Sequence, residues 1–277
     1  MQINWRLKSL LFGVFDIIGE RPLYWVQKHV TGRSRVVIRD IPLYWRFHAE
    51  TIARYGSRNL IEFGAGKSLS QNLFLSRPEL HQTVVDLNAM IDLSQVNDAI
   101  RILHEMGARP ASQPVSNLEE LEAIYAIRYL APFDMRATGF LAGSYDLCIS
   151  TNTLEHIPAD SIRRIFSELR RVLVSGGVVS AVIGYSDHYA HTDSRITPLN
   201  YLRFTEQQWR RYNHDCHYQN RLRHRHYLDL FQQVGFNVVL SRATDCSSDV
   251  PGDLHPSTLT GDATDYALTG DWILENP

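Results

Sequence analysis

From about residue 58 onward, two hydrophobic patterns alternate along the chain. Short apolar runs predict buried strands, and segments with apolar residues three or four positions apart predict amphipathic helices. The predicted strands are 59–63, 82–86, 126–131, 145–150, 178–183, 236–240 and 266–274. The predicted helices between them are 68–75, 93–106, 117–124, 159–173 and 226–234. Strands that alternate with helices predict an α/β fold with a doubly wound, mainly parallel sheet of seven strands.

Residues 1–57 precede this alternation and form a separate N-terminal helical segment in our interpretation. Apolar side chains recur at helical spacing at Leu7, Leu10, Leu11, Val14, Phe15 and Ile18. We expect this stripe to pack against the main domain, residues 58–277; a helix on a membrane surface through residues 5–18, or a lid over the substrate pocket, remains open. A second helix is predicted over 42–55.

The stretch 59–68, NLIEFGAGKS, combines a strand, an acid and a glycine turn. Gly64 and Gly66 allow a tight turn and close approach of a bound group, and the following helix begins near Ser68. A phosphate-binding P-loop needs a glycine where Ile61 stands, and a dinucleotide turn needs one at Leu69. An acid-x-Gly-x-Gly turn at the end of a strand remains.

Two further motifs complete a resemblance. The run 144–158, SYDLCISTNTLEHIP, places an aspartate in an apolar strand and opens a helix with Leu-Glu-His, and 173–177, LVSGG, ends the next helix. With the glycine turn, these segments resemble the class I S-adenosylmethionine-dependent methyltransferases. The resemblance spans about residues 58–275, but it rests on position alone from 184 to 218. It implies S-adenosylmethionine as the cofactor and a last strand inserted antiparallel between its neighbours.

The resemblance also implies residues for the cofactor. The methionine end is expected at Glu62, Gly64 and Gly66, with Asn152 nearby, and the adenine at Asp134 and Met135. Asp86 ends the second strand 20 residues after Gly66, a spacing that suits a carboxylate accepting hydrogen bonds from both ribose hydroxyls; Leu87 follows it. Simple capping or loop roles for the two aspartates remain alternatives.

The loop GYSDHYAHTD after the fifth strand is expected at the pocket mouth. In one interpretation His188 or His191 takes a proton from a substrate hydroxyl, with Asp187 orienting the ring. In a second, the same three residues bind a divalent metal ion, and in a third they are polar loop residues only. The D-H-x-x-H spacing is too short and too common to predict a metal site, so none is assigned.

Residues 184–227 form an insertion rich in arginine and aromatic residues, which suits an anionic or sugar-like acceptor. We expect acceptor contacts from Tyr185, Arg221 and Arg223. His156 either contacts the acceptor or packs near the cofactor at the start of a helix. Nucleic acid is the rival ligand, and the net charge of −2 argues against it.

The overall composition predicts where in the cell the protein lies. Three scattered cysteines indicate a reducing compartment, and no apolar run approaches the roughly 20 residues that span a bilayer. We therefore expect a cytoplasmic protein, and a contact of its basic N-terminal segment with the inner face of a membrane remains open. The predicted function is O-methylation of a small-molecule or glycan acceptor. A nicotinamide-dependent oxidoreductase and a non-catalytic S-adenosylmethionine-binding subunit are the alternatives.

Overall fold

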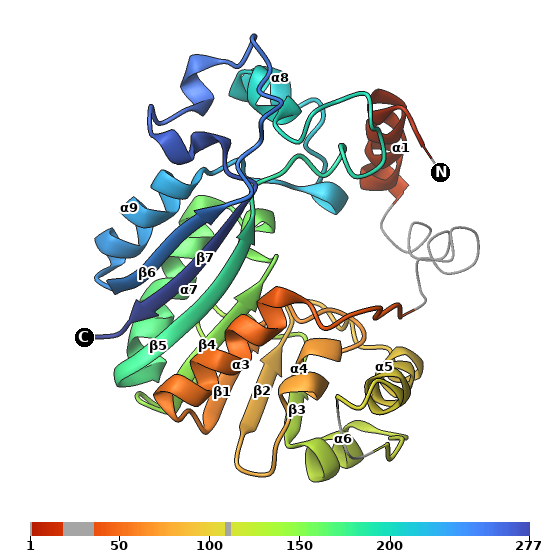
Figure 1. Ribbon diagram of the computed structural model, residues 1–277, viewed down its shortest axis with the longest axis vertical. Helices are drawn as coiled ribbons and strands as arrows, with labels where there is room; N and C mark the ends of the chain where they lie inside the picture. The colour runs from red at the N-terminus through yellow and green to blue at the C-terminus, as the bar shows by residue number, and fades with distance from the viewer. Residues whose placement is uncertain (1, 19–35, 109–111) are drawn as a thin grey trace.

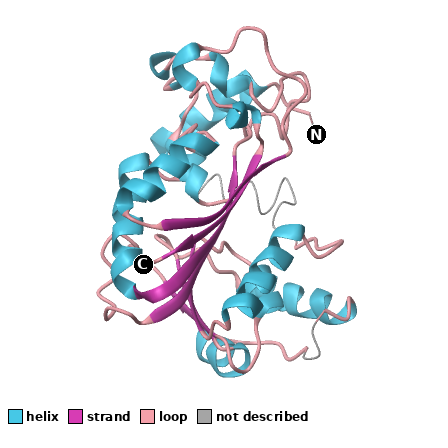
Figure 2. Ribbon diagram, turned by 60° about the vertical axis from the view of Figure 1, so that its left-hand side comes forward, coloured by secondary structure: helices cyan, strands magenta, loops and turns pink. Residues whose placement is uncertain are grey.

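The computed structural model describes residues 2–18, 36–108 and 112–277. Its centre is a seven-stranded sheet with helices on both faces (Figures 1 and 2). The strands are β1 (Asn59–Phe63), β2 (His81–Val85), β3 (Ile127–Leu130), β4 (Tyr145–Thr151), β5 (Leu173–Gly184), β6 (Asn237–Thr244) and β7 (Thr269–Glu275). Their order across the sheet is β3-β2-β1-β4-β5-β7-β6, and only β7 runs antiparallel to its neighbours. The predicted fold class and the antiparallel insertion of the last strand are confirmed.

The helices divide between the two faces of the sheet. One face carries α3 (Leu43–Tyr55), α4 (Ser70–Leu75), α5 (Leu93–Glu105) and α6 (Leu118–Tyr125), and the other carries α7 (Ala159–Val172) and α9 (His224–Val234) (Figure 1). Successive strand residues face opposite sides, so neighbours in β1 enter different cores. Leu60 packs with Ile52 of α3, whereas Ile61 packs with Phe166 of α7. Both faces of the sheet are therefore buried.

The end of α7 differs from the prediction. The helix stops at Val172, and Leu173 is already extended as the first residue of β5. Gly176, with φ of +75°, therefore shapes the start of a strand and does not cap a helix. Its amide donates to the carbonyl of Asn276 at 2.7 Å, which ties this bend to the C-terminal end of the chain. The glycine rule for helix ends holds at Gly235, the left-handed cap of α9.

Helix α1 (Trp5–Ile18) lies against the insertion and not against the sheet (Figure 1). Trp5 and Phe12 join a core formed mainly by insertion residues, and the Trp5 amide donates to Asp193 at 2.8 Å. The predicted buried stripe is therefore wrong, because four of its members face outward. These side chains are Leu7, Leu10, Leu11 and Val14, which are 48–70% exposed.

The remainder of the N-terminal segment is described only in part, since residues 19–35 lie outside the described residues. The predicted second helix is confirmed as α3, which contacts α4, β4 and β5. Among the helices within residues 2–18, 36–108 and 112–277, none is both long enough and apolar enough to cross a membrane.

Candidate active site

The glycine turn after β1 stands at the centre of the candidate site. Gly64 has φ of +78°, and a Cβ there would lie 2.4 Å from Cγ2 of Thr153, so only glycine fits. The Thr153 hydroxyl donates to the Gly64 carbonyl at 3.3 Å and holds the turn against the end of β4. Gly66 has φ of +76° and open space where a Cβ would be. The backbone at Gly66 is therefore accessible to a bound group.

Two cavities share Gly64. The first, of about 430 Å³, is lined by Glu62, Ser70, Gln71, Thr151 and Asn152, with residues 36–40 and Trp45 forming another wall. The second, of about 480 Å³, is lined by Asp86, Leu87, Asp134, Met135 and His156, among others. Both lie at the carboxyl ends of parallel strands, where ligands bind in open α/β sheets.

Glu62 lies buried at the inner end of the first cavity. Its carboxylate accepts hydrogen bonds from Nδ2 of Asn72 at 2.6 Å and from Nε2 of Gln71 at 3.2 Å. Burial raises the pKa of Glu62 to about 8, and the hydrogen bond from Asn72 opposes this rise. A cationic group in the cavity would restore the ionised form. This arrangement suits the ammonium of a methionine moiety.

Asp86 lies at the corresponding place in the second cavity. Its carboxylate accepts a hydrogen bond from the Tyr129 hydroxyl at 2.8 Å, and burial raises its pKa to about 6. The residue is fixed from both sides, because its carbonyl accepts from the Phe133 amide at 2.8 Å. A positioned carboxylate beside a cavity is what ribose hydroxyls require.

The predicted adenine residues line the same cavity. The Asp134 carboxylate forms a two-pronged ion pair with Arg136, at 2.7 Å from Nη2 and 3.0 Å from Nε, and this pair lowers its pKa. An adenine amino group at Asp134 would share this carboxylate with Arg136. Met135 is 5% exposed and packs with the α7 side of the core, whereas Leu87 is 63% exposed at the cavity rim.

Of the three predicted catalytic residues, the structure brings His188 and His191 together but not Asp187. The Asp187 carboxylate is fully buried and accepts from the Tyr189 amide and from Asn200, both at 2.8 Å. The His191 ring bonds to the Ser186 hydroxyl and lies 5.0 Å from the His188 ring, centroid to centroid. Since the Asp187 carboxylate bonds to neither imidazole, the structure does not bring Asp187 to the two histidines. Burial lowers the pKa of His188 to about 3, which leaves its ring neutral and weakly basic.

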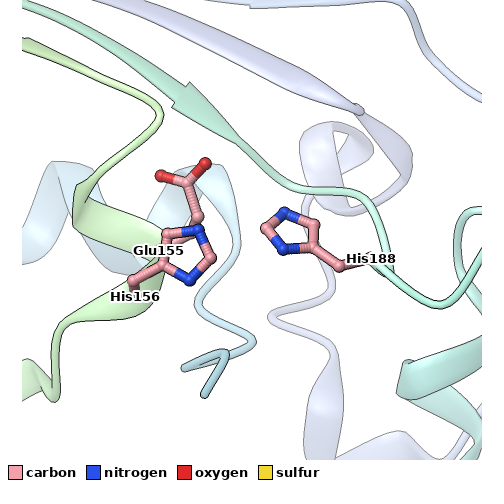
Figure 3. Close-up of side chains that lie close together, drawn as sticks. All are labelled: Glu155, His156 and His188. Carbon is pink, nitrogen blue, oxygen red and sulfur yellow. The ribbon is translucent and has the colours of Figure 1, made fainter. Parts of the chain in front are cut away.

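His188 instead lies near Glu155, which is not among the predicted site residues. Glu155, His156 and His188 each offer one ligand atom, and these atoms lie within 4.8 Å of one another (Figure 3). The Glu155 carboxylate is 3% exposed, and burial raises its pKa to about 8. The Leu-Glu-His motif at 154–156 was the available signal, but nothing in it shows which way the glutamate points.

Three of the expected acceptor contacts serve the protein interior. Arg223 is fully buried and donates to the carbonyls of Tyr185, Asp265 and Ala267. Arg221 donates to the carbonyls of Tyr201 and Phe204 and pairs with Glu206. The Tyr185 hydroxyl accepts from the Trp272 indole at 3.0 Å inside the core.

The aromatic residues of the insertion are also largely interior. Tyr201 and Trp209 are each 1% exposed and belong to the core that receives α1. The insertion therefore does not present them as a surface for a sugar ring. His156 does line the second cavity, and its Nδ1 lies 2.9 Å from the Tyr218 carbonyl.

The residues at the cleft fit S-adenosylmethionine. The turn lacks Cβ atoms where a ligand would approach, Glu62 and Asp86 stand in separate cavities on its two sides, and Asn152 lines the first cavity in a left-handed backbone conformation, φ +49°. The ligand's two polar ends, an ammonium and a ribose, match these two carboxylates.

Comparisons with known proteins bear on the family of the chain and not on its individual site residues. Residues 110–181 match the family model of a methyltransferase domain. A search of curated protein sequences found no match. The family match and the strand order confirm the resemblance to class I S-adenosylmethionine-dependent methyltransferases, which are enzymes, and S-adenosylmethionine as the cofactor.

Solved structures similar to the chain include three named as methyltransferases or complexes of them. The apo form of the S-adenosylmethionine-dependent methyltransferase SibL is 16% identical, with a TM-score of 0.47 over 85% of this chain and 55% of that chain. A complex of the Haloferax volcanii Trm112 methyltransferase activator with a putative methyltransferase is 15% identical, with a TM-score of 0.49 over 96% of this chain and 97% of that chain. A Methanosarcina mazei S-adenosylmethionine-dependent methyltransferase is 15% identical, with a TM-score of 0.46 over 81% of this chain and 96% of that chain. The chain thus spans about half the length of SibL, and these distant alignments do not bear on the acceptor.

Proposed function

We propose that this chain, a class I S-adenosylmethionine-dependent methyltransferase, transfers the methyl group to a hydroxyl of a small-molecule or glycan acceptor. The observation that carries the proposal is that His156, which lines the second of the two cavities beside Gly64, lies in one group with the Glu155 carboxyl and the His188 imidazole. A hydroxyl acceptor must lose its proton for the transfer, whereas the two cavities need no such groups to hold the cofactor.

The chain's own residues divide the work. Glu62 holds the ammonium of the methionine end, Asp86 holds the ribose, and Asp134 with Met135 meets the adenine. S-adenosylmethionine supplies an activated methyl carbon on a sulfonium. Residues 36–40, 42, 44 and 45 line one wall of the first cavity and act as a lid over the methionine end. Alignment of acceptor, methyl carbon and sulfur in line is the main contribution of such a cleft.

The proton of the acceptor hydroxyl falls to the group formed by Glu155, His156 and His188. His188 acting alone is a weak base, because burial lowers its pKa to about 3. The buried Glu155 carboxyl, with a pKa raised to about 8, lies beside it. Asp187 supports the loop through Asn200 and Tyr189, and His191 stays at the outer edge of the loop.

The test is transfer of a labelled methyl group. The purified chain is incubated with methyl-labelled S-adenosylmethionine and a panel of phenols, hydroxylated lipids and sugars, and products are assigned by the chemical shift of the new methyl group. An O-methyl product supports the proposal. A C-methyl or N-methyl product contradicts the hydroxyl acceptor. Cofactor binding without transfer to any member of the panel favours a non-catalytic subunit, and binding of NADH instead favours an oxidoreductase.

A peripheral membrane contact through α1 and a cytoplasmic location are part of the same proposal. Leu7, Leu10, Leu11 and Val14 form an exposed apolar face, and residues 1–57 hold nine Lys/Arg against four Asp/Glu. This combination suits the anionic inner face of a membrane. The double substitution Leu7→Ser and Leu10→Ser should abolish co-sedimentation with vesicles that contain phosphatidylglycerol. Equal sedimentation of both proteins would contradict the contact.

A further inference from the structure

The Glu155 side chain has an unsatisfied oxygen. Oε1 lies 3.3 Å from the Gly184 amide, which donates to it, but Oε2 has no hydrogen-bond partner among the described residues. The side chain is 3% exposed, so water does not replace the missing partner at the surface. A buried carboxylate oxygen without a partner costs free energy, which is a reason to look for a ligand that completes it.

Two imidazoles face this carboxylate. The rings of His156 and His188 lie 4.8 Å apart, centroid to centroid, and Figure 3 shows the Glu155 carboxylate beside both. One ligand atom from each of the three residues lies within 4.8 Å of the other two. Two ligand atoms that each lie about 2.0–2.2 Å from one ion are at most about 4.4 Å apart, so the three side chains need only small movements to reach a common ion.

The hydrogen bonds around the two rings leave nitrogen atoms available. His156 Nδ1 lies 2.9 Å from the Tyr218 carbonyl, so Nδ1 carries the proton that it donates and Nε2 keeps its lone pair. Metal-binding histidines commonly show this pattern, in which the second ring nitrogen is held by a carbonyl. The His188 ring has no hydrogen-bond partner among residues 2–18, 36–108 and 112–277, although its backbone amide donates to Gln219.

We propose that Glu155, His156 and His188 bind a divalent transition-metal ion at the ends of β4 and β5. Two imidazole nitrogens and one carboxylate oxygen are the ligand set of catalytic zinc sites and of sites that keep open coordination positions. The set differs from Asp187, His188 and His191, which the sequence suggests, because Glu155 replaces Asp187 and His156 replaces His191. The site needs no change in backbone, since all three side chains already converge.

The role of this ion rests on the proposed function. An open position on the ion accepts the acceptor hydroxyl and lowers its pKa. With the ion bound, the three side chains are its ligands and no longer take the proton themselves, so the hydroxyl releases its proton to solvent. The oxygen then forms a bond to the methyl carbon, and the carbon–sulfur bond breaks to leave S-adenosylhomocysteine. Metal and acceptor are then held together at the strand ends that also carry Asn152 and Gly184.

The test is metal binding, which requires neither acceptor nor turnover. The full chain, stripped with a chelator, is titrated with Co²⁺ while its visible absorption is recorded, and with Zn²⁺ by calorimetry. We expect one ion per chain. Glu155→Gln, which keeps the shape of the side chain, and His188→Ala should each weaken binding by roughly 100-fold. His191→Ala is the matched control, because its ring stacks beside that of His188 but lies outside the group.

Each outcome decides one proposal. Absence of Co²⁺ and Zn²⁺ binding, unchanged affinity in Glu155→Gln, or an equal loss in His191→Ala overturns the metal site. The affinity for S-adenosylmethionine is measured on the same preparations and also shows that each variant is folded. A chain that binds S-adenosylmethionine but no metal leaves the proposed function standing, whereas one that binds metal but no S-adenosylmethionine keeps the site and overturns that function.

Discussion

The imidazole of His48 lies 2.9 Å from the hydroxyl of Thr151, measured from Nε2 to Oγ1. Thr151 in turn donates to Oε1 of Gln71 at 3.1 Å, and Gln71 donates to Glu62 at 3.2 Å. Because the Thr151 hydroxyl has one proton and gives it to Gln71, His48 Nε2 carries the proton of the first bond. Nδ1 then accepts from the Ser180 hydroxyl at 2.8 Å, a shorter contact than the 3.4 Å between Ser180 and Thr51. Helix α3 is thus joined to the methionine end of the cleft by continuous hydrogen bonds.

The burial of His48 in this chain of hydrogen bonds predicts that the free energy of unfolding falls at acidic pH. His48 is fully buried, and burial lowers its pKa to about 3, whereas in the unfolded chain it titrates near 6.5. Between these values the unfolded state binds one more proton, so the free energy of unfolding falls as the pH drops below about 6.5. The substitution His48→Gln removes the contribution of His48 to the pH dependence of the free energy of unfolding. From pH 6.5 to pH 5 the variant should lose about 2 kcal/mol less stability than the parent protein.

Urea unfolding followed by circular dichroism at each pH measures both slopes. Other buried histidines titrate equally in the two proteins, so only the difference is informative. If the free energy of unfolding of the two proteins changed in parallel with pH, His48 would already be protonated in the folded chain. The assigned directions of its hydrogen bonds would then be wrong.

A second prediction concerns the proton on Glu62. With a pKa of about 8, the carboxyl is largely protonated at pH 7, and an arriving ammonium should ionise it. Binding of S-adenosylmethionine should therefore release a proton. Calorimetry at pH 7 in buffers of different ionisation enthalpy measures this release. Glu62→Gln should abolish it and weaken binding roughly tenfold; a release that persists in the variant would assign the proton to another group.

Arg223 predicts a loss of stability and not of acceptor affinity. Its guanidinium is fully buried, and its removal leaves the Tyr185, Asp265 and Ala267 carbonyls without this donor. Arg223→Met should lower the free energy of unfolding by roughly 2–4 kcal/mol. Arg225→Met, which breaks an exposed pair with Asp229, is the control and should change it by under about 1 kcal/mol. A stable Arg223→Met protein with a raised acceptor KM would restore the acceptor role.

Local patterns predicted the fold well because the sheet is buried on both faces. Continuous apolar runs such as β1 then mark strands directly, and β1 begins and ends at the predicted residues. The glycine turn was predictable for a different reason: the acid, the two glycines and the start of the helix follow one another directly in the sequence.

Contacts between distant segments were not predictable in this way. The buried face of α1 depends on an insertion almost 190 residues away, so helical spacing alone selected the wrong side. The carbonyls that surround Arg223 come from three separate segments. The orientation of Glu155 depends on Gly184, where a Cβ would lie 2.8 Å from Oε1. None of these relationships leaves a signal within a single stretch of sequence.

The central claim is that the cleft around Gly64 holds S-adenosylmethionine with Asp86 on the ribose. The most direct measurement is calorimetric titration of S-adenosylmethionine into the parent protein, into Asp86→Ala, and into Asp98→Ala as an exposed control on α5. Our account predicts one bound molecule per chain, an affinity roughly 10- to 100-fold weaker in Asp86→Ala, and an unchanged affinity in Asp98→Ala. Equal affinity in all three proteins, or absence of binding to the parent, would contradict it.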